Sequence, residues 1–220
     1  MRLTSTVFIL VSSLLLHTNA NSASFNCAKA KSKVEKAICG DNDLSKLDEQ
    51  LSTAYKASLR LHPLPDYVKS RQRDWVSLNQ YCDSSNLIVC LKKNYQERIA
   101  HLTGINNLTV YSNTKKFSYS NGDVVVEYWL ADKQWKFSVW GGFVIHQQAS
   151  EDNGKPTYVG CEFDGKMSNP NSRQAINSDG TKIGFKLNSN TLTFDESTDT
   201  EICAGFGRLP EGALEKVSKN

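Results

Sequence analysis

The 220-residue sequence lacks the short motifs that mark most enzymes. It has no Gly-x-Ser-x-Gly, no His-Glu-x-x-His and no phosphate-binding loop, and its few histidines lie in no known nucleophile or metal motif. Sequence spacing does not test for a pair of catalytic carboxylates, because their action depends on the distance between the two carboxyl groups in the folded protein. We therefore expect a protein that is not an enzyme, with no catalytic residue, no metal site and no cofactor.

The excess of positive over negative charge is also small, which argues against nucleic acid as a partner. The formal net charge is +3, and the Lys and Arg residues are dispersed along the chain. Residues 21–103 carry 13 basic and 9 acidic side chains, whereas residues 104–220 carry 12 and 14. The first half is thus mildly basic and the second mildly acidic, a difference that would steer a charged protein partner.

Long apolar runs are limited to one, near the beginning. A basic residue precedes an uncharged apolar stretch from Val7 to Leu16, and a small-x-small sequence ends at Ala20. This pattern is typical of a cleaved signal peptide over residues 1–20, with cleavage after Ala23 as the alternative. The stretch is shorter than the roughly 20 residues of a membrane span, and no lipid-attachment pattern precedes the first cysteine. We expect a soluble periplasmic or secreted protein with no membrane anchor.

All six cysteines lie after this leader, in what we expect to be an oxidising compartment. An even number of cysteines there favours three disulfides. A zinc site is disfavoured, since there is no Cys-x-x-Cys and no closely spaced histidine. Spacing does not fix the connectivity, and we expect nearest-neighbour pairs: Cys27–Cys39, Cys82–Cys90 and Cys161–Cys203.

The apolar period is helical up to about residue 104. Ser32 and Glu35 form a capping-box signature, Asp43 and Asn86 are expected N-caps, and Gly104 is expected to end the last helix. Four buried helical faces follow from the spacing of apolar residues. The second to fourth consist of Leu44, Leu47, Leu51, Ala54, Tyr55 and Leu59; Val68, Trp75, Leu78 and Cys82; and Leu87, Leu91, Tyr95, Ile99 and Leu102.

A region of about 80 residues buries only a modest core and needs covalent staples. Closing the loop from Cys27 to Cys39 should contribute about 3 kcal/mol. A straight helix between them would hold the two sulfurs too far apart. Residues 27–31 must therefore fold back as a turn before the helix begins at Ser32.

From residue 106 onward the apolar period falls to two, as in strands. Alternation is clearest for Val124, Val126, Tyr128 and Leu130 against Val125, Glu127 and Trp129. Turn or interruption signals occur at Asn121-Gly122, Asp132-Lys133, Gly141-Gly142, Asp164-Gly165, Asp179-Gly180 and Asn188-Ser189-Asn190. The fold expected is α+β: a disulfide-stapled helical domain over residues 21–104, then an antiparallel β-sandwich or small barrel over residues 105–220.

The first half resembles the N-terminal domain of the LprI family, a group of exported proteins named for a lysozyme inhibitor. The resemblance covers about residues 25–103. It rests on Phe25, Cys27, Val34, Glu35, Ile38, Cys39, Leu44, Leu47, Asp48, Leu51, Tyr55, Gln72, Arg73, Trp75, Cys82, Cys90, Leu91, Tyr95, Arg98 and Ile99. Most of these are expected core residues. The polar ones, Asp48, Arg73, Glu35 and Arg98, are expected to form an ion-pair network between helices.

The resemblance implies a non-catalytic binding protein that inhibits lysozyme or a related cell-wall hydrolase. Two other functions stay open. One is an immunity protein that neutralises a periplasm-acting toxin, such as a type VI secretion effector. The other is a module that binds peptidoglycan or another carbohydrate. The partner is thus a lysozyme-type hydrolase or a secreted toxin, with peptidoglycan possible.

Four carboxylates just before Cys203 form the first candidate target-binding surface: Asp195, Glu196, Asp199 and Glu201. A loop pinned by a disulfide could enter a basic cleft at low entropic cost. The alternative is a solvated connection between strands.

Two tryptophans, Trp129 and Trp140, form the second candidate surface. They fall on the parity opposite to the expected strand core. We therefore expect them to be exposed, where tryptophan often anchors an interface or stacks on a sugar ring.

Overall fold

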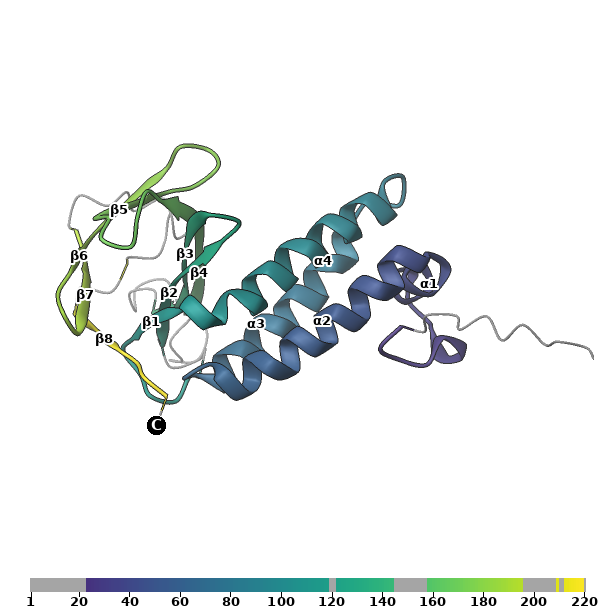
Figure 1. Cartoon of the computed structure of the whole chain (residues 1–220), viewed down its shortest axis with the longest axis horizontal. Coiled ribbons are helices and arrows are strands. Elements are labelled where there is room, and N and C mark those ends of the chain that lie inside the picture. Colours follow the sequence, from purple (N-terminus) through teal and green to yellow (C-terminus); the bar gives the residue numbers. More distant parts are fainter. Residues whose placement is uncertain (1–22, 119–121, 145–157, 196–208, 210–211, 220) are drawn as a thin grey trace, which may run out of the picture.

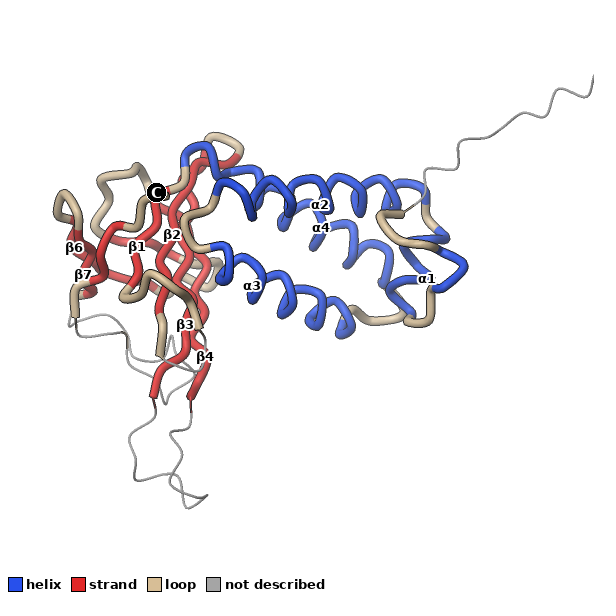
Figure 2. The backbone as a smooth tube through the Cα atoms, turned by 90° about the horizontal axis from the view of Figure 1, so that it is seen from below, coloured by secondary structure: helices blue, strands red, loops and turns tan. Residues whose placement is uncertain are grey.

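The computed structural model describes residues 23–118, 122–144, 158–195, 209 and 212–219, and it joins a helical part to a closed antiparallel barrel (Figure 1). The barrel lies at one end of an elongated molecule, and the helices extend away from it with α1 at the far end (Figures 1 and 2). The expected α+β class is confirmed, and of the two β architectures the barrel is the one formed. The helices are η1 (Cys27–Lys29), α1 (Lys33–Gly40), α2 (Asn42–Leu61), α3 (Pro65–Leu78), η2 (Asn79–Tyr81), α4 (Leu87–Thr103) and η3 (Gly104–Asn107).

The helix starts follow from local capping. At α1 the expected capping box is confirmed: Glu35 N–H donates to Ser32 Oγ, and Ser32 N–H donates to Glu35 Oε2. The expected N-cap of α2 is wrong by two residues, because the Asp41 side chain accepts from Leu44 N–H while Asp43 lies in the first turn. Gly104 is the C-cap of α4, as expected.

Both disulfides of the helical part form with the expected pairing. The Cα atoms of Cys27 and Cys39 are 5.7 Å apart, and those of Cys82 and Cys90 are 5.9 Å apart. The chain reverses through the short helix η1 before α1 begins, so the fold-back expected of residues 27–31 is confirmed. The partner expected for Cys161, Cys203, lies outside the described residues.

Helix α2 packs along α4, and α3 contacts the C-terminal half of α2. Proline at the first position of α3 needs no hydrogen bond there, which lets the helix begin directly after the turn. One member of the third apolar stripe was wrongly expected to be core: Leu78 is 56% exposed at the end of α3.

The barrel has eight strands, each paired with its neighbours in chain order and closed by β1 against β8. They are β1 (Thr109–Ser112), β2 (Val124–Ala131), β3 (Gln134–Val144), β4 (Tyr158–Met167), β5 (Gln174–Ile176), β6 (Lys182–Leu187), β7 (Thr191–Phe194) and β8 (Leu214–Lys216).

The turn signals are only partly right. Asp132 and Lys133 both have positive φ, which is the geometry of a type I′ hairpin turn between β2 and β3. The segment 188–190 links β6 to β7 as expected. Two expected breaks are wrong, because Gly141-Gly142 lies within β3 and Asp164-Gly165 lies within β4. At Gly141 and Gly165 a side chain would collide with the neighbouring backbone, so glycine there permits close strand packing rather than a turn.

The described residues form two hydrophobic cores that share strand β2. Val124, Val126 and Tyr128 point into the barrel, where they join Phe137 and Phe185. Val125, on the opposite face, belongs to a core made mainly of helix residues. The helices therefore cover the outer face of β2 and β3, so these strands are buried on both sides. Within the described residues, no helix is both long and apolar enough to span a membrane.

Candidate functional site

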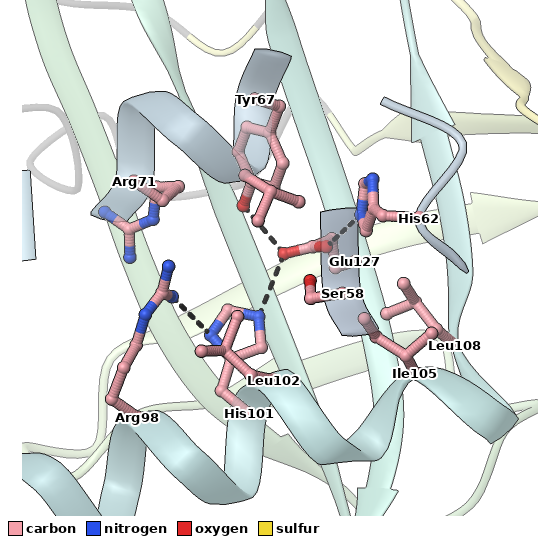
Figure 3. A pocket seen from close by; sticks show the side chains of 11 residues that line it. Ser58, His62, Tyr67, Arg71, Arg98, His101, Leu102, Ile105, Leu108 and Glu127 are labelled. Atoms are coloured by element: carbon pink, nitrogen blue, oxygen red, sulfur yellow. Dashed lines mark hydrogen bonds and ion pairs between the residues drawn. The ribbon is translucent and has the colours of Figure 1, made fainter. Parts of the chain in front are cut away.

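A buried carboxylate lies where the helices meet the outer face of the barrel (Figure 3). Glu127 is on β2 and is 1% exposed. Its Oε1 lies 2.7 Å from His62 Nε2, just after α2, and its Oε2 accepts from Tyr67 Oη of α3 at 2.7 Å. Oε2 also lies 3.2 Å from His101 Nε2 of α4. One side chain of the barrel thus contacts all three long helical segments.

The hydrogen bonds fix the tautomer of both histidines. Leu64 N–H donates to His62 Nδ1 at 2.8 Å, so that nitrogen carries a lone pair and Nε2 carries the proton. Arg98 Nη1 likewise lies 3.2 Å from His101 Nδ1, which must therefore be the acceptor. Both neutral rings then donate from Nε2 to Glu127, so the carboxylate is ionised and held by three donors.

The surroundings stabilise the charged form of Glu127. Burial alone would raise the pKa of this carboxyl group, but hydrogen bonds from His101 and His62 outweigh burial and hold the pKa well below its ordinary value. The pKa of Tyr67 is raised well above its ordinary value by burial, and next by the Glu127 charge, so the phenol stays a donor.

Two arginines lie beside this carboxylate. Arg71 of α3 donates from Nη2 to Glu162 Oε1 of β4 at 2.6 Å, and its guanidinium lies 5.0 Å from the centre of the Trp140 ring. Arg98 of α4 donates from Nε to Gln72 Oε1 at 3.0 Å. Burial, and next the charge of Arg71, lower the pKa of Arg98 to about 10.

Strand register explains why these groups meet. On the outer face Glu127 is opposite Ser138, and Ser138 is opposite Asp164. The neighbouring row runs from Val125 to Trp140 to Glu162. The outer face therefore presents rows of mixed polar and aromatic side chains to α3 and α4.

A cleft of about 930 Å³ opens beside this site, between α3, α4 and strands β2 to β4. Arg71, Arg98, His101 and Trp129 contribute to its wall. Glu127 and His62 do not line it; they line an inner cavity of about 10 Å³, roughly the space of one water. The carboxylate therefore does not reach the cleft, whereas the side chains of both arginines form part of its wall. No group of three or more potential metal ligands is found among the described residues.

The expectation that Trp129 and Trp140 are exposed is wrong. They are 6% and 5% exposed, because α3 and α4 cover the strand face on which they lie. The Trp129 ring stacks on His101 with centroids 4.3 Å apart, and Trp140 packs edge-on against Tyr67. The alternation along the strands correctly places both tryptophans on the face outside the barrel. It carries no information about which elements cover that face.

Of the acidic candidate surface only Asp195 is described. It is half-buried at the end of β7, with Oδ1 3.6 Å from Lys186 Nζ and its backbone N–H donating to Gly184 O. Glu196, Asp199 and Glu201 lie outside the described residues, so a target-binding role for this stretch stays a prediction.

The ion-pair network expected among Asp48, Arg73, Glu35 and Arg98 is wrong for these described residues. Asp48 is buried and accepts from Tyr95 Oη at 3.0 Å and from Ser24 N–H at 2.7 Å. Glu35 serves the capping box, and Arg73 is exposed. Arg73 lies 3.5 Å from Ser70 Oγ and Arg98 donates to Gln72, so none of the four residues pairs with another of the set.

Sequence reasoning missed Glu127, His62, His101, Tyr67 and Arg71 as a group. A signal was present: Glu127 shares its strand parity with Val125 and Trp129. A charged residue between two large apolar ones on a single face indicates a covered face with a buried polar contact. The donors come from segments up to 65 residues away, so spacing could not name them.

Comparison with known proteins supports a partial relationship. The chain is 31% identical over 80 residues to Lipoprotein LprI of Mycobacterium tuberculosis and of Mycobacterium bovis. The matched segment is 36% of this chain and 40% of the length of those relatives. The chain therefore contains an LprI-like segment, in agreement with the resemblance seen in its sequence. No family model matches the chain, and no solved structure matches it.

Proposed function

We propose that this chain is an exported, non-catalytic binding protein that inhibits a lysozyme-type cell-wall hydrolase. The observation that carries the proposal is the LprI-like segment, since the resemblance seen in the sequence is to a family named for a lysozyme inhibitor. The relatives are named as lipoproteins, which supports export to the cell envelope. Two disulfides in the helical part suit an oxidising compartment.

The closed state of the buried carboxylate supports a non-catalytic role. A general acid or base must reach its substrate within hydrogen-bond distance. Glu127 is 1% exposed and already accepts from three protein donors, so the Glu–His set stabilises the junction rather than reacting. The alternative of a carbohydrate module rested on exposed Trp129 and Trp140, and their burial removes that basis.

The direct test is inhibition of lysozyme by the folded chain without residues 1–20. Suspended bacterial cell walls are digested by a c-type lysozyme, and the loss of turbidity is followed at increasing ratios of this protein to enzyme. We expect the rate to fall in a saturable manner, with a complex visible on size exclusion. A soluble oligosaccharide substrate is the second arm, since inhibition there cannot come from masking of the wall.

The matched control is the same chain after reduction and alkylation, which removes the disulfide-held fold. An unchanged digestion rate at excess folded protein, with no complex on the column, would contradict the proposal. The acidic stretch is tested in the same assay by changing Asp195, Glu196, Asp199 and Glu201 to their amides. Electrostatic docking predicts weaker inhibition and a smaller salt dependence; equal inhibition at all salt concentrations would exclude that surface.

A further inference from the structure

Two buried arginines in the wall of the cleft retain unused N–H groups. Arg98 is 6% exposed and the Arg71 side chain 11% exposed. Within the described part of the chain, Arg98 Nη2 and Arg71 Nε are buried and have no hydrogen-bond partner. Both side chains contribute to the cleft wall, and because buried donors are almost always paired in proteins, their two unpaired N–H groups indicate a missing acceptor.

The two guanidinium groups are held in place by their other contacts. Arg98 uses Nε on Gln72 and Nη1 on His101, and Arg71 uses Nη2 on Glu162. Figure 3 shows the two guanidinium groups close together on one side of the site, with that of Arg98 directed toward that of Arg71. A ligand placed between them would meet donors that are already oriented, so little conformational entropy would be lost on binding.

The lack of an ion pair at Arg98 favours an anion here: Arg71 pairs with Glu162, whereas Arg98 makes no ion pair among the described residues. Two like charges lie close together here, and their repulsion contributes to the lowered pKa of Arg98. Glu127 lies nearby, but its hydrogen bonds go to His62, His101 and Tyr67 and none goes to either guanidinium. An acceptor-only group between the arginines would satisfy both free donors and reduce the repulsion.

The rest of the cleft limits what kind of anion fits. Its volume of about 930 Å³ is in the range of small-molecule sites. Trp75 and Trp129 line it, which suits a flat or ring-shaped ligand body. Glu162 and Asp164 also line it, and they would repel a doubly charged phosphate more than a singly charged carboxylate.

We propose that Arg71 and Arg98 bind the carboxylate of a small ring-bearing monocarboxylic acid, whose body lies in the cleft beside Trp75 and Trp129. This inference is independent of the inhibitor function. A negative lysozyme assay leaves it standing, and a negative ligand titration leaves the inhibitor proposal standing.

The test is an NMR titration of the folded, isotope-labelled chain, observing the Arg71 Nε–H signal, with assignment by Arg71→Lys. Two matched pairs of probes separate the carboxylate from the ring: benzoate with benzamide, and N-acetylmuramic acid with N-acetylglucosamine. Inorganic phosphate is the fifth probe. We expect saturable shifts with at least one carboxylate and none with its neutral partner, and weaker binding of phosphate.

Variants then assign the contacts. Arg71→Lys and Arg98→Lys keep the charge but lose the free donors, and each should weaken binding roughly tenfold, as expected for one charge-assisted hydrogen bond. Arg73→Lys, on the exposed side of α3, should bind as the unchanged chain does. If Arg98→Lys does not fold, the comparison of ligand affinity between the unchanged chain and Arg71→Lys tests the inference. No shift with either carboxylate, equal shifts with the neutral partners, or tighter binding of phosphate would overturn the inference.

Discussion

Removing the Glu127 carboxylate should destabilise the molecule, because this one group of the barrel accepts hydrogen bonds from three helical segments. Glu127→Ala leaves His62, Tyr67 and His101 without their acceptor in a region closed to water. Glu127→Gln keeps the volume but removes the charge and turns an acceptor oxygen into a donor. The two variants thus separate loss of the acceptor from loss of the charge.

The size of the effect follows from the number of donors. A hydrogen bond to a charged group contributes about 1.5–3 kcal/mol, so three lost bonds amount to a gross ~4.5–9 kcal/mol. Removing a buried carboxylate also relieves its desolvation, which costs several kcal/mol. We therefore expect a net loss of about 3–5 kcal/mol for Glu127→Ala, the range typical of a broken buried charge contact, and about 2 kcal/mol for Glu127→Gln.

The measurement is the free energy of unfolding from urea titrations at pH 7, with intact disulfides. Glu162→Gln is the matched control, since that side chain is 44% exposed, lies on the same outer face and pairs with Arg71 alone among the described residues. It should lose less than about 1 kcal/mol. If Glu127→Ala lost no more than this control at an equal urea dependence, the carboxylate would not be what holds the parts together.

Three further predictions concern the pH dependence due to Glu127, the glycine beside Trp129 and the disulfide between Cys27 and Cys39. The lowered pKa of Glu127 adds stability that is present above its ordinary value of 4.5 and is lost as pH falls below it, so Glu127→Gln should flatten the acid side of the stability–pH curve; an unchanged slope would contradict this. Gly104→Ala would place its Cβ against Trp129 Cδ1, so it should cost about 1–3 kcal/mol, whereas Gly40→Ala meets nothing within 4 Å and should be neutral or stabilising by thermal melting. Replacing Cys27 and Cys39 together by serine should cost about 3 kcal/mol in urea unfolding, and a loss below 1 kcal/mol would show that the fold-back holds without the bond.

The parts of the fold that depend on local chemistry could be predicted from the sequence. The capping box at Ser32 and Glu35 requires only side chains three residues apart, and it forms as expected. The Asp132-Lys133 hairpin and the change of apolar period near residue 106 are local in the same sense. Glycine was the weak signal: Gly141 and Gly165 allow close packing within strands, an effect that a turn rule cannot distinguish from a break.

The parts that depend on contacts between the two halves could not be predicted. The alternation of residues along β2 predicts one strand face in the core and one in solvent. In the structure both faces of β2 are buried. Trp129 and Trp140 were therefore expected in solvent, although they lie under α3 and α4. Once the helices are known to cover this face, Glu127 becomes a buried charge that must find donors.

Two polar members of the LprI-like pattern, Gln72 and Arg98, lie at this same junction and not in the interior of the helical part. Arg98 Nε of α4 donates to Gln72 Oε1 of α3 at 3.0 Å. Arg98 also contacts His101, which in turn contacts Glu127. Asp48, in contrast, is buried within the helices against Tyr95. The shared pattern thus has two physical roles: one set of residues holds the helices together, and the other places a guanidinium at the face that meets the barrel. In this chain Arg98 orients the His101 ring, and His101 in turn donates to the Glu127 carboxylate of strand β2.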